Sequence, residues 1–409
     1  MQNHILGLDV GSHSIKAVVA ELKKNGQLSL LKILKMPSAG LRRGVVEDMA
    51  EATRALNQVF AEVKQVSKSA HKNIYLGVAS TDFRSQLSKG IVAVSRADSE
   101  IHKDDIDRAI DASQAIKLPA NRMIVHSVTR AFVVDDIVDV ADPLGMIGSR
   151  LEVSSLIIDA LAPGIKNLMR CVEGAGGSIS SLIFNPLAVS RSVLSRNQRD
   201  LGVVTIDIGF GKTGVSIYEE NKLLHTAVSP VGSGHATNDL AIGLKTSIPA
   251  AENIKLTLGS ATAKDVPARE QVDLTKYDPV AKNAVTRRFI SEILEARFAE
   301  IMEFVNNELK HIGKSARLPA GAILLGGGSK LPGIVDLAKQ ELRLSVQVGF
   351  PNTSEFEVQN AELISRSEDP EMACAFGLVL WGKDKMTGED SSGGMKFDWL
   401  KKIFKVFIP

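Results

Sequence analysis

The sequence predicts an α/β protein made of two related halves, with an α+β segment inserted into the first half and an amphipathic helix at the C-terminus. Three observations lead to this fold class. Apolar strand patterns alternate with amphipathic helical patterns along most of the 409 residues. A strand–turn–strand motif near the N-terminus returns at residue 201, and a separate α+β pattern fills residues 84–160.

Composition places the chain among ordinary folded proteins and excludes several functional classes. Hydrophobic residues make up 44% and charged residues 23%, typical of a soluble globular chain. The 49 Lys and Arg against 47 Asp and Glu leave a net charge of +2, so no nucleic-acid partner is expected. Cys171 and Cys374 lack metal-ligand spacing and indicate core packing in a reducing compartment. Without a basic leader or an apolar run of ~18 residues, the chain is expected to stay in the cytoplasm.

The first 200 residues are predicted to alternate strands and helices. Alternating apolar residues indicate strands, and apolar residues three and four apart indicate helices, one of which ends before Pro119. The predicted extended segments are 5–10, 15–22, 28–35, 74–94, 124–138, 151–160 and 181–185, and the predicted helices are 48–66, 103–116, 164–173 and 186–194. Residues 84–160 are therefore expected to form a compact α+β unit inserted after the first sheet.

The motif that begins the chain is repeated in its second half. LGLDVGSHSIKAVV (6–19) aligns with VTIDIGFGKTGVSI (204–217), so that Asp9 falls on Asp207. The apolar strand before each turn and the alternating strand after it match as well. An internal duplication explains this agreement better than the chance similarity of one Asp–Gly turn.

The paired turns have the composition of a phosphate-binding site. Glycine lets backbone N–H groups approach phosphate oxygens closely, and two facing hairpins would hold a phosphate chain between them. Asp9 and Asp207, each at the end of a strand, are candidates for holding a hydrated Mg²⁺ ion bound to the phosphates. The predicted phosphate-binding residues are Asp9, Gly11, Ser12, Ser14 and Lys16 in the first turn and Asp207, Gly209, Gly211, Lys212 and Thr213 in the second.

Three alternatives use the same residues. A single hairpin of this kind is most often a tight turn in a sheet, and only the pair favours a ligand. Gly209, Gly211 and Gly214 match GxGxxG, but dinucleotide binding requires a helix after the turn, where VSIY predicts a strand. The GKT at 211–213 resembles the end of a Walker A loop, but Ile206 occupies the position of that loop's first glycine.

A third glycine-rich turn, AILLGGGSKLPG, separates a predicted strand from a helix whose start is marked by Pro332. Its bare backbone suits a flat ring such as a nucleoside, although a strand-to-helix turn that needs space has the same pattern. Glu252 and Lys255 lie three residues apart on a predicted helix, so they share one face and can reach ribose or base. The alternative is a solvated ion pair. The predicted nucleoside-binding residues are Gly326, Gly327, Gly328, Ser329, Glu252 and Lys255.

These segments resemble known nucleotide-binding elements. LDVGSHSIK, TIDIGFGKTG, residues 237–241, AENIK and LLGGGSKLPG look like the phosphate-1, phosphate-2 and adenosine elements of the actin, Hsp70 and sugar-kinase superfamily. Within it, the chain is similar to the FtsA family of bacterial cell-division proteins. RRGVVED, residues 124–134 and PLGMIGSRLEV resemble the SHS2-like domain that this family carries in place of an actin subdomain. The resemblance implies a duplicated actin-like ATPase fold, two RNase H-like halves around a nucleotide cleft, with ATP and Mg²⁺ as cofactors.

The resemblance also implies a division of the chain into six parts. These are a first core half (1–83, 161–200 and 366–382), the inserted subdomain (84–160), a second core half (201–245 and 319–365), a partner-binding subdomain (246–318), a flexible linker (383–394) and an amphipathic membrane-targeting helix (395–409). Each core half is therefore expected to be interrupted by one smaller unit.

The second phosphate loop departs from the family pattern. That pattern reads Asp-x-Gly-Gly-Gly-Thr followed soon by an acidic residue, whereas Phe210, Lys212 and Gly214 stand at those places here. No carboxylate is recognisably placed to orient a water molecule, so no catalytic base is assigned. We therefore expect at most a weak ATPase, in which nucleotide acts as a structural and polymer switch.

The C-terminal segment KFDWLKKIFKVFI is predicted to be an amphipathic helix at the membrane surface. At 100° per residue, its aromatic and aliphatic residues fall on one arc and its lysines on the other. Four lysines less Asp398 give +3, worth about 1 kcal/mol per charge near an anionic leaflet. The alternative is a helix docked on the protein's own core or on a partner. The predicted membrane-contacting residues are Phe397, Trp399, Leu400, Lys401, Lys402, Ile403, Phe404, Lys405 and Phe407.

The FtsA resemblance implies the remaining partners. FtsA-like proteins form actin-like protofilaments, and they receive the C-terminal peptide of the tubulin-like FtsZ on the subdomain that holds the predicted helix 285–310. Arg297 and Glu300 on the polar face of that helix are the candidate contacts, and an ordinary solvated face is the alternative. The implied function is an adaptor on the cytoplasmic side of the inner membrane at the division site, which tethers the FtsZ ring and helps recruit other divisome proteins.

Two other functions fit parts of the sequence. A pilus-assembly adaptor of the PilM type shares the implied fold, but its length and its lack of a terminal anchor fit less well. A sugar or acetate kinase, or an Hsp70-type ATPase, requires a catalytic carboxylate and has no use for a membrane helix.

Overall fold

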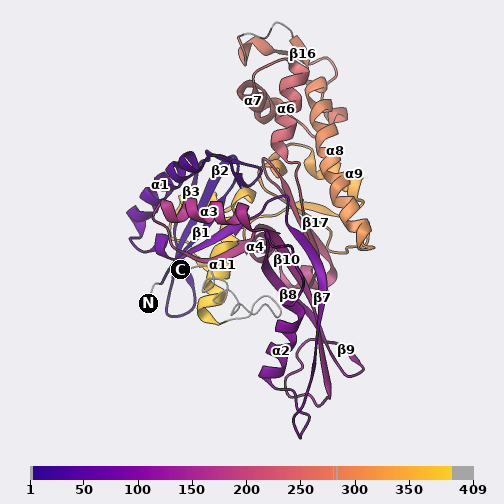
Figure 1. Ribbon diagram of the computed structural model, residues 1–409. Coiled ribbons are helices and arrows are strands. Elements are labelled where there is room, and N and C mark those ends of the chain that lie inside the picture. Colours follow the sequence, from indigo (N-terminus) through magenta and orange to yellow (C-terminus); the bar gives the residue numbers. More distant parts are fainter. Residues whose placement is uncertain (1–2, 280, 282–283, 389–409) are drawn as a thin grey trace.

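The computed structural model describes residues 3–279, 281 and 284–388. Two α/β units form the middle of the molecule, a mostly helical unit extends from one end, and a separate sheet with one helix extends from the other (Figure 1). The predicted α/β class with an inserted α+β unit is thus confirmed.

The first sheet has six strands in the order β11-β6-β1-β2-β3-β19. The strands β1, β2 and β3 form an antiparallel meander, and β6 and β11 extend the sheet in parallel to β1. Both faces of β1 are covered, which is why this strand is an almost continuous apolar run. The strands are β1 (His4–Val10), β2 (Ser14–Leu22), β3 (Leu28–Pro37), β6 (Ile74–Val78), β11 (Ile179–Phe184) and β19 (Phe356–Glu357), with a small hairpin of β4 (Leu41–Arg42) and β5 (Val45–Val46) after β3.

Two pairs of helices pack around this sheet. Helix α1 packs on α3 and β3, whereas α11 packs on α4 and β1. The Asp48 side chain caps α1 by accepting the Glu51 N–H at 2.9 Å. A proline in the first turn of α3 and of α4 starts each of them directly after a strand. The helices of this half are α1 (Met49–Val66), α3 (Ala162–Gly174), α4 (Asn185–Val193), α5 (Arg196–Leu201), α10 (Ala361–Ser367) and α11 (Ala373–Thr387).

The second sheet repeats the arrangement of the first. Its order is β14-β13-β12-β17-β18, with an antiparallel meander of β12, β13 and β14 and with β17 and β18 parallel to β12. The hairpins β1–β2 and β12–β13 therefore occupy equivalent places, in agreement with the predicted duplication. The elements are β12 (Val203–Ile208), β13 (Thr213–Glu219), β14 (Lys222–Ser229), β17 (Ala322–Leu325), the 3₁₀ turn η4 (Gly327–Lys330), α9 (Ile334–Leu342) and β18 (Val346–Val348).

One boundary between the halves differs from the prediction. Residues 319–365 are predicted for the second half, but β19 pairs with β3 of the first sheet. The Leu28 N–H donates to the Glu355 carbonyl at 3.1 Å and joins the same segments. The chain thus returns to the first sheet well before residue 366, and a two-residue strand is too short to show periodicity.

The inserted unit is a four-stranded sheet in the order β7-β10-β8-β9, with α2 packed on β7 and β10. Ile101, Ala109, Leu151 and Val153 are completely buried between the helix and the sheet and give this unit its own apolar core. The predicted insertion covers 84–160, and the elements of this unit run from Arg84 to Leu161. These are β7 (Arg84–Ala93), α2 (Lys103–Gln114), β8 (Arg122–Val134), β9 (Ile137–Val140) and β10 (Arg150–Leu161).

The helical unit at the opposite end is built on the longest helix of the described residues. Ile290, Leu294, Ile301 and Val305 of α8 are completely buried at helical spacing, and α6 and α7 pack beside this stripe. Its elements are α6 (Ser233–Leu244), α7 (Ile248–Leu258), β15 (Gln271–Asp273), β16 (Ala284–Thr286) and α8 (Arg287–His311).

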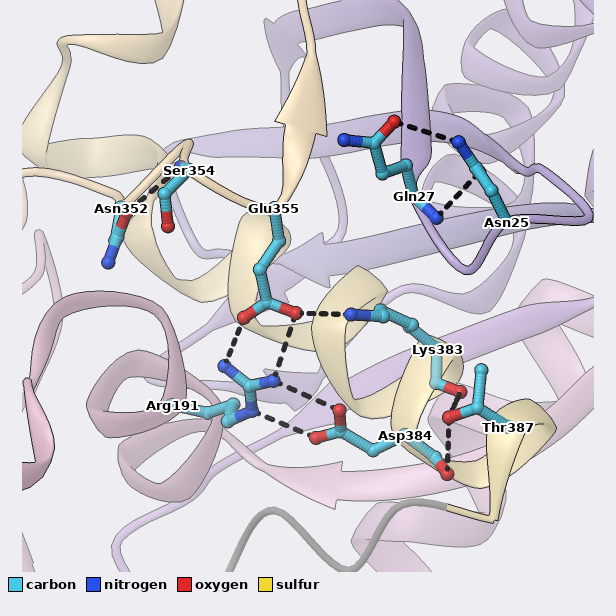
Figure 2. A network of polar contacts seen from close by, with 9 residues as sticks. All are labelled: Asn25, Gln27, Arg191, Asn352, Ser354, Glu355, Lys383, Asp384 and Thr387. Atoms are coloured by element: carbon cyan, nitrogen blue, oxygen red, sulfur yellow. Dashed lines mark hydrogen bonds and ion pairs between the residues drawn. The ribbon is translucent and has the colours of Figure 1, made fainter.

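The end of α11 corrects the predicted linker. Residues 383–387 are helical, and a network of ion pairs holds them against the core (Figure 2). Arg191 binds Glu355 at 2.9 Å and Asp384 at 2.8 Å, and Lys383 binds Glu355 at 2.7 Å. These polar residues have partners from distant segments, which local composition cannot indicate. Residues 389–394 of the linker and the whole predicted membrane helix lie outside the described residues.

Candidate functional site

A cleft lies between the two equivalent hairpins. The β1–β2 and β12–β13 turns, α7, the glycine turn after β17 and the start of α11 wall a space of about 1420 Å³, its open mouth included. All of the predicted nucleotide-binding residues except Thr213 and Ser329 line this cleft. Segments that are far apart in the sequence therefore meet at one place.

The two hairpins share a register but carry different side chains. Asp9 lies opposite Lys16 in the first hairpin, and Asp207 lies opposite Gly214 in the second. A backbone hydrogen bond closes each turn in the same way, at 3.2 Å in the first and 3.0 Å in the second. The duplicated backbone thus presents a charged pair on one side of the cleft and a lone carboxylate on the other.

The electrostatics of the cleft floor follow from this difference. Lys16 Nζ lies 3.5 Å from an Asp9 oxygen, and Asn185 donates to the other Asp9 oxygen at 3.0 Å. Burial opposes the charge of Lys16, but Asp9, Glu371 and Asp207 outweigh it and raise the Lys16 pKa. Asp207 accepts no hydrogen bond from the described residues. Burial, with the negative charge of Asp9, raises the pKa of Asp207 to about 6.

The loop between β4 and β5 lies against both turns. The Ser12 hydroxyl accepts the Gly44 N–H at 3.1 Å, and the Lys212 ammonium donates to the Ala79 carbonyl. Burial lowers the pKa of Lys212. Gly44 has a φ of +81°, and a Cβ there would lie 2.5 Å from Lys212 Nζ. The second lysine of the cleft is therefore held by backbone rather than by a carboxylate.

The glycine turn packs directly on the end of β12. A Cβ on Gly326, whose φ is +76°, would lie 2.4 Å from Asp207 Oδ1, and one on Gly328 would lie 2.3 Å from Ile208 Cγ2. Gly327 is less crowded, since its nearest neighbour would be Glu371 at 3.5 Å. Two of the three glycines are thus required by the strand-to-helix turn, and the same close packing leaves bare backbone in the cleft wall.

The two charged residues of α7 form a partly buried ion pair rather than a fully solvated one. Lys255 Nζ lies 2.7 Å from Glu252, and it also donates to the Thr237 hydroxyl at 2.8 Å and to the Ser233 carbonyl at 3.3 Å. Lys255 is only 6% exposed, and burial lowers its pKa. Both side chains line the cleft, as the predicted nucleoside contacts should.

Two predicted contacts lie behind the cleft wall. The Thr213 hydroxyl donates to the Val231 carbonyl at 2.8 Å, and the Ser329 hydroxyl donates to the Gly326 carbonyl at 2.7 Å. Both residues are buried, so their hydroxyls stabilise the turns and do not face the cleft.

Several lining residues were not predicted. Lys35 and Lys330 both bind Glu371 at 2.8 Å and, against the effect of burial, lower its pKa to about 2. Nothing in the local sequence of these three residues indicates a site. Asn185 did offer a signal, because it directly follows β11, as Asp9 and Asp207 stand at the ends of their strands.

Phe210 brings the tips of the hairpins together. Its ring stacks on His13 of the first hairpin with centroids 4.8 Å apart, and it lies so close to Gly234 that a Cβ there would come within 2.6 Å of it. The Lys255 ammonium lies 5.7 Å from the ring centroid. Phe210, one of the three residues that depart from the family pattern, therefore forms part of the wall and links the two halves.

The oxygen ligands of the cleft fit a hydrated magnesium ion. Asp9 and Asp207 both line the space, and the charge of one raises the pKa of the other. A divalent cation between them would relieve this repulsion, and carboxylates are ligands that Mg²⁺ accepts through its waters. When bound, such an ion would neutralise phosphate charge, while Lys16 and Lys212 supply the fixed positive charge.

The predicted partner contacts lie on α8, outside the cleft walls. Arg297 binds Asp239 of α6 at 2.6 Å and also pairs with Glu300. Arg297 therefore ties two helices together, whereas the Glu300 side chain is 50% exposed. The predicted membrane contacts, from Phe397 to Phe407, lie outside the described residues.

The fold and the cleft between its duplicated sheets define an actin-like class of protein. A solved structure of a "PilM-PilN type IV pilus biogenesis complex" matches with a TM-score of 0.67 and 19% identity over 93% of this chain and 98% of that one. MreB 5 of Spiroplasma citri, described as bound to AMPPNP, matches with a TM-score of 0.56 and 13% identity over 95% and 98%. At these identities the likeness shows the fold alone. The PilM-type alternative therefore gains no functional support from it.

Sequence comparison identifies the family. The family profile described as "Cell division protein FtsA" matches residues 204–377, and the one described as "SHS2 domain inserted in FTSA" matches residues 81–159. "Cell division protein FtsA" from Pseudomonas aeruginosa is 32% identical over 383 residues, 94% of this chain and 90% of that relative. The Bacillus subtilis relative of the same name is 33% identical over 347 residues, 85% and 78%. The chain belongs to the FtsA family, and it is a cell-division protein with an actin-like fold and an SHS2 insertion.

Proposed function

We propose that this protein is an ATP-binding adaptor that assembles on the cytoplasmic side of the inner membrane at the division site and tethers the FtsZ ring to it. The observation that carries the proposal is the cleft, where two hairpins of equal register bring Asp9, Lys16, Asp207 and Lys212 to one space. Membership of the FtsA family supports the role in division.

ATP with Mg²⁺ is the ligand that uses the whole cleft. The hairpins offer backbone N–H groups and lysines to a polyphosphate, the two aspartates suit the metal, and the glycine turn with Glu252 and Lys255 suits the nucleoside. The AMPPNP bound to MreB 5, which shares the fold, supports this choice. Titration with a fluorescent ATP analogue, with and without Mg²⁺, tests it. An affinity for the analogue that changes neither when Mg²⁺ is removed nor when Asp207 is replaced in Asp207→Asn would contradict it.

Membrane binding is assigned to the C-terminal segment that includes Trp399, Phe404 and the lysines 401, 402 and 405. One such helix binds weakly, and many copies in a filament gain avidity, so polymerisation makes the anchor effective. The test is co-pelleting with anionic vesicles in ATP, comparing 1–409 with a chain that stops at 394. We expect the truncated chain to stay in the supernatant. A full-length variant with both Lys401→Glu and Lys402→Glu keeps the C-terminal segment but removes positive charge. Comparing it with the truncated chain separates the effect of charge from the effect of removing the segment.

FtsZ binding is assigned to the helical unit around α8. Arg297 forms an ion pair with Asp239, so we expect it to hold α6 and α8 in place rather than to contact the peptide. We expect the exposed Glu300 to contact the peptide. Fluorescence anisotropy with an FtsZ tail peptide tests this. Glu300→Lys should weaken binding, and Glu292→Lys on the same helix serves as the control. If the unmodified chain does not bind the peptide at tens of micromolar, the assignment of this partner is wrong.

Self-association into actin-like protofilaments and recruitment of other divisome proteins complete the proposal. Membership of the FtsA family supports protofilaments, because the family resemblance implies actin-like self-association. Sedimentation with ATP, ADP and no nucleotide, in the absence of lipid, tests whether nucleotide controls assembly. Phosphate release measured in the same samples should be slow, since no carboxylate is assigned as a catalytic base.

A further inference from the structure

A second cavity lies where three units of the molecule meet. Its walls come from β8 of the inserted unit, from α4, α5 and α11 of the first half, and from the β13–β14 hairpin of the second half. It measures about 940 Å³ with its opening, and it shares no lining residue with the nucleotide cleft. A ligand here would contact all three units without touching nucleotide.

Two of the four cations in this cavity have acidic partners. Arg191 is bound by Glu355 and Asp384, as Figure 2 shows. Lys222 lies 2.8 Å from Asp139 of the inserted unit and 3.5 Å from Glu220. The positive charge of these two side chains is therefore already balanced within the protein.

The other two cations, Arg130 and Arg199, have no acidic side chain within ion-pair distance among the described residues; Asp139 and Asp384 act on them only from farther away. Neither guanidinium makes a hydrogen bond or an ion pair with the residues that the structure describes, and the Nε atom of each is buried and unsatisfied. Burial lowers the pKa of both. Both arginines are partly buried, and buried polar atoms are almost always hydrogen-bonded, so two buried Nε atoms without a partner in one cavity indicate a site for an anion.

We propose that this cavity binds a small oxyanion of the phosphate or pyrophosphate class, held between Arg130 of β8 and Arg199 of α5. A guanidinium offers N–H donors in a fixed fork that matches phosphate oxygens. The positive charges of the two guanidiniums match the charge of about −1.5 to −2 that a phosphate group carries near neutral pH. Because the two arginines come from different units, the bound anion would fasten the inserted unit to α5 of the first half.

The protein offers a local probe for this site. It has two tryptophans, and Trp381 lines the cavity while the other is Trp399. In a full-length Trp399→Phe protein, Trp381 fluorescence is titrated with sodium phosphate and with pyrophosphate, and sodium chloride at equal ionic strength is the blank. We expect a saturable change with phosphate or pyrophosphate and none with chloride.

Matched substitutions assign the signal. Arg130→Gln and Arg199→Gln should each raise the apparent Kd at least tenfold, and Arg54→Gln, at an exposed site on α1, should change it less than twofold. Lys16→Ala in the nucleotide cleft should leave the signal intact. Arg199→Lys keeps the charge without the fork and should bind with intermediate affinity if Arg199→Gln does not fold. The bound anion should also raise the Tm of the parent protein more than that of the two Gln variants.

Three outcomes would overturn the proposal. The first is no saturable response beyond chloride in the parent protein. The second is equal binding by the parent and by both folded Gln variants. The third is a signal that disappears with Lys16→Ala, which would place the anion in the nucleotide cleft.

Discussion

The two hairpins of the cleft share one backbone plan and differ in charge. Asp9 has Lys16 opposite and the Asn185 amide beside it, whereas Asp207 has Gly214 opposite and accepts no hydrogen bond from the described residues. The first hairpin is thus electrostatically balanced by itself. The second is not, and the pKa of about 6 for Asp207 reflects that.

The neighbouring parallel strands show the same contrast. A Cβ on Gly77, opposite Asp9, would lie 2.7 Å from Asn185 Oδ1, so this glycine makes room for a partner of the aspartate. Gly326 instead makes room for Asp207 itself. Duplication therefore supplied the symmetric frame, and the halves diverged into one side with a balanced carboxylate and one side whose carboxylate is unbalanced.

Gly326→Ala should have the largest effect of the substitutions that separate the two sides. It combines a φ of +76° with a Cβ only 2.4 Å from Asp207 Oδ1. We expect a loss of about 2–4 kcal/mol in the free energy of unfolding and loss of nucleotide binding. Gly26→Ala, at φ +83° with no atom within 4 Å, isolates the backbone cost and should lose only about 1 kcal/mol. Urea unfolding measures both, and equal losses would show that the contact with Asp207 does not matter.

Lys16→Ala should weaken ATP binding more than Lys212→Ala does. Lys16 stands among three carboxylates that raise its pKa, so it is fully charged, whereas burial lowers the pKa of Lys212 and a backbone carbonyl holds it. We expect Lys16→Ala to lose about 2–3 kcal/mol of binding free energy, which raises the Kd for ATP roughly 30- to 150-fold. Lys212→Ala should lose less. Titration of both variants with the same ATP analogue measures this. A reversed order would mean that the second hairpin carries the phosphate charge.

Asp207→Asn should stabilise the protein without ligand, and Asp9→Asn should destabilise it. The folded pKa of Asp207, about 6, lies above the unfolded value of about 3.9, so the folded state binds protons more tightly and loses stability as pH rises through this window. Asparagine cannot ionise, so the gain should reach about 1–2 kcal/mol above pH 7 and disappear near pH 4. Asp9→Asn instead deprives Lys16 of its nearest carboxylate. Thermal unfolding across pH 4–8 measures both, and a pH-independent gain would contradict the charge argument.

The parts of the cleft that could be predicted from the sequence are those in which one short segment contains the complete pattern that indicates a binding residue. Asp9 and Asp207 each stand at the end of an apolar strand with glycine two residues on, and the repetition of that pattern located both. Glu252 and Lys255 could be predicted from their spacing, because residues three apart on a helix lie on the same face.

The parts that could not be predicted depend on side chains that meet only after folding. Glu371 joins the cleft because Lys35 and Lys330 reach it from two other segments. Residues 383–387 have the composition of a linker, and they are helical because Arg191 and Glu355 hold Asp384 and Lys383. A charged segment read by its composition alone is expected to face solvent. These charged side chains instead pair with partners from distant segments, and the local sequence does not contain that information.

Phe210 and His13 make the smallest of the expected contributions and the most direct link between the two hairpins. Their rings stack with centroids 4.8 Å apart, and such pairs contribute about 0.5–1.5 kcal/mol beyond their buried area. Phe210→Ala should lose more stability than His13→Ala, because its ring also packs on Gly234. A double-mutant cycle by urea unfolding should give a coupling of about 1 kcal/mol. Additive losses would mean that the stacked rings do not hold the halves together, and the closure of the cleft would then depend on the charges at its floor.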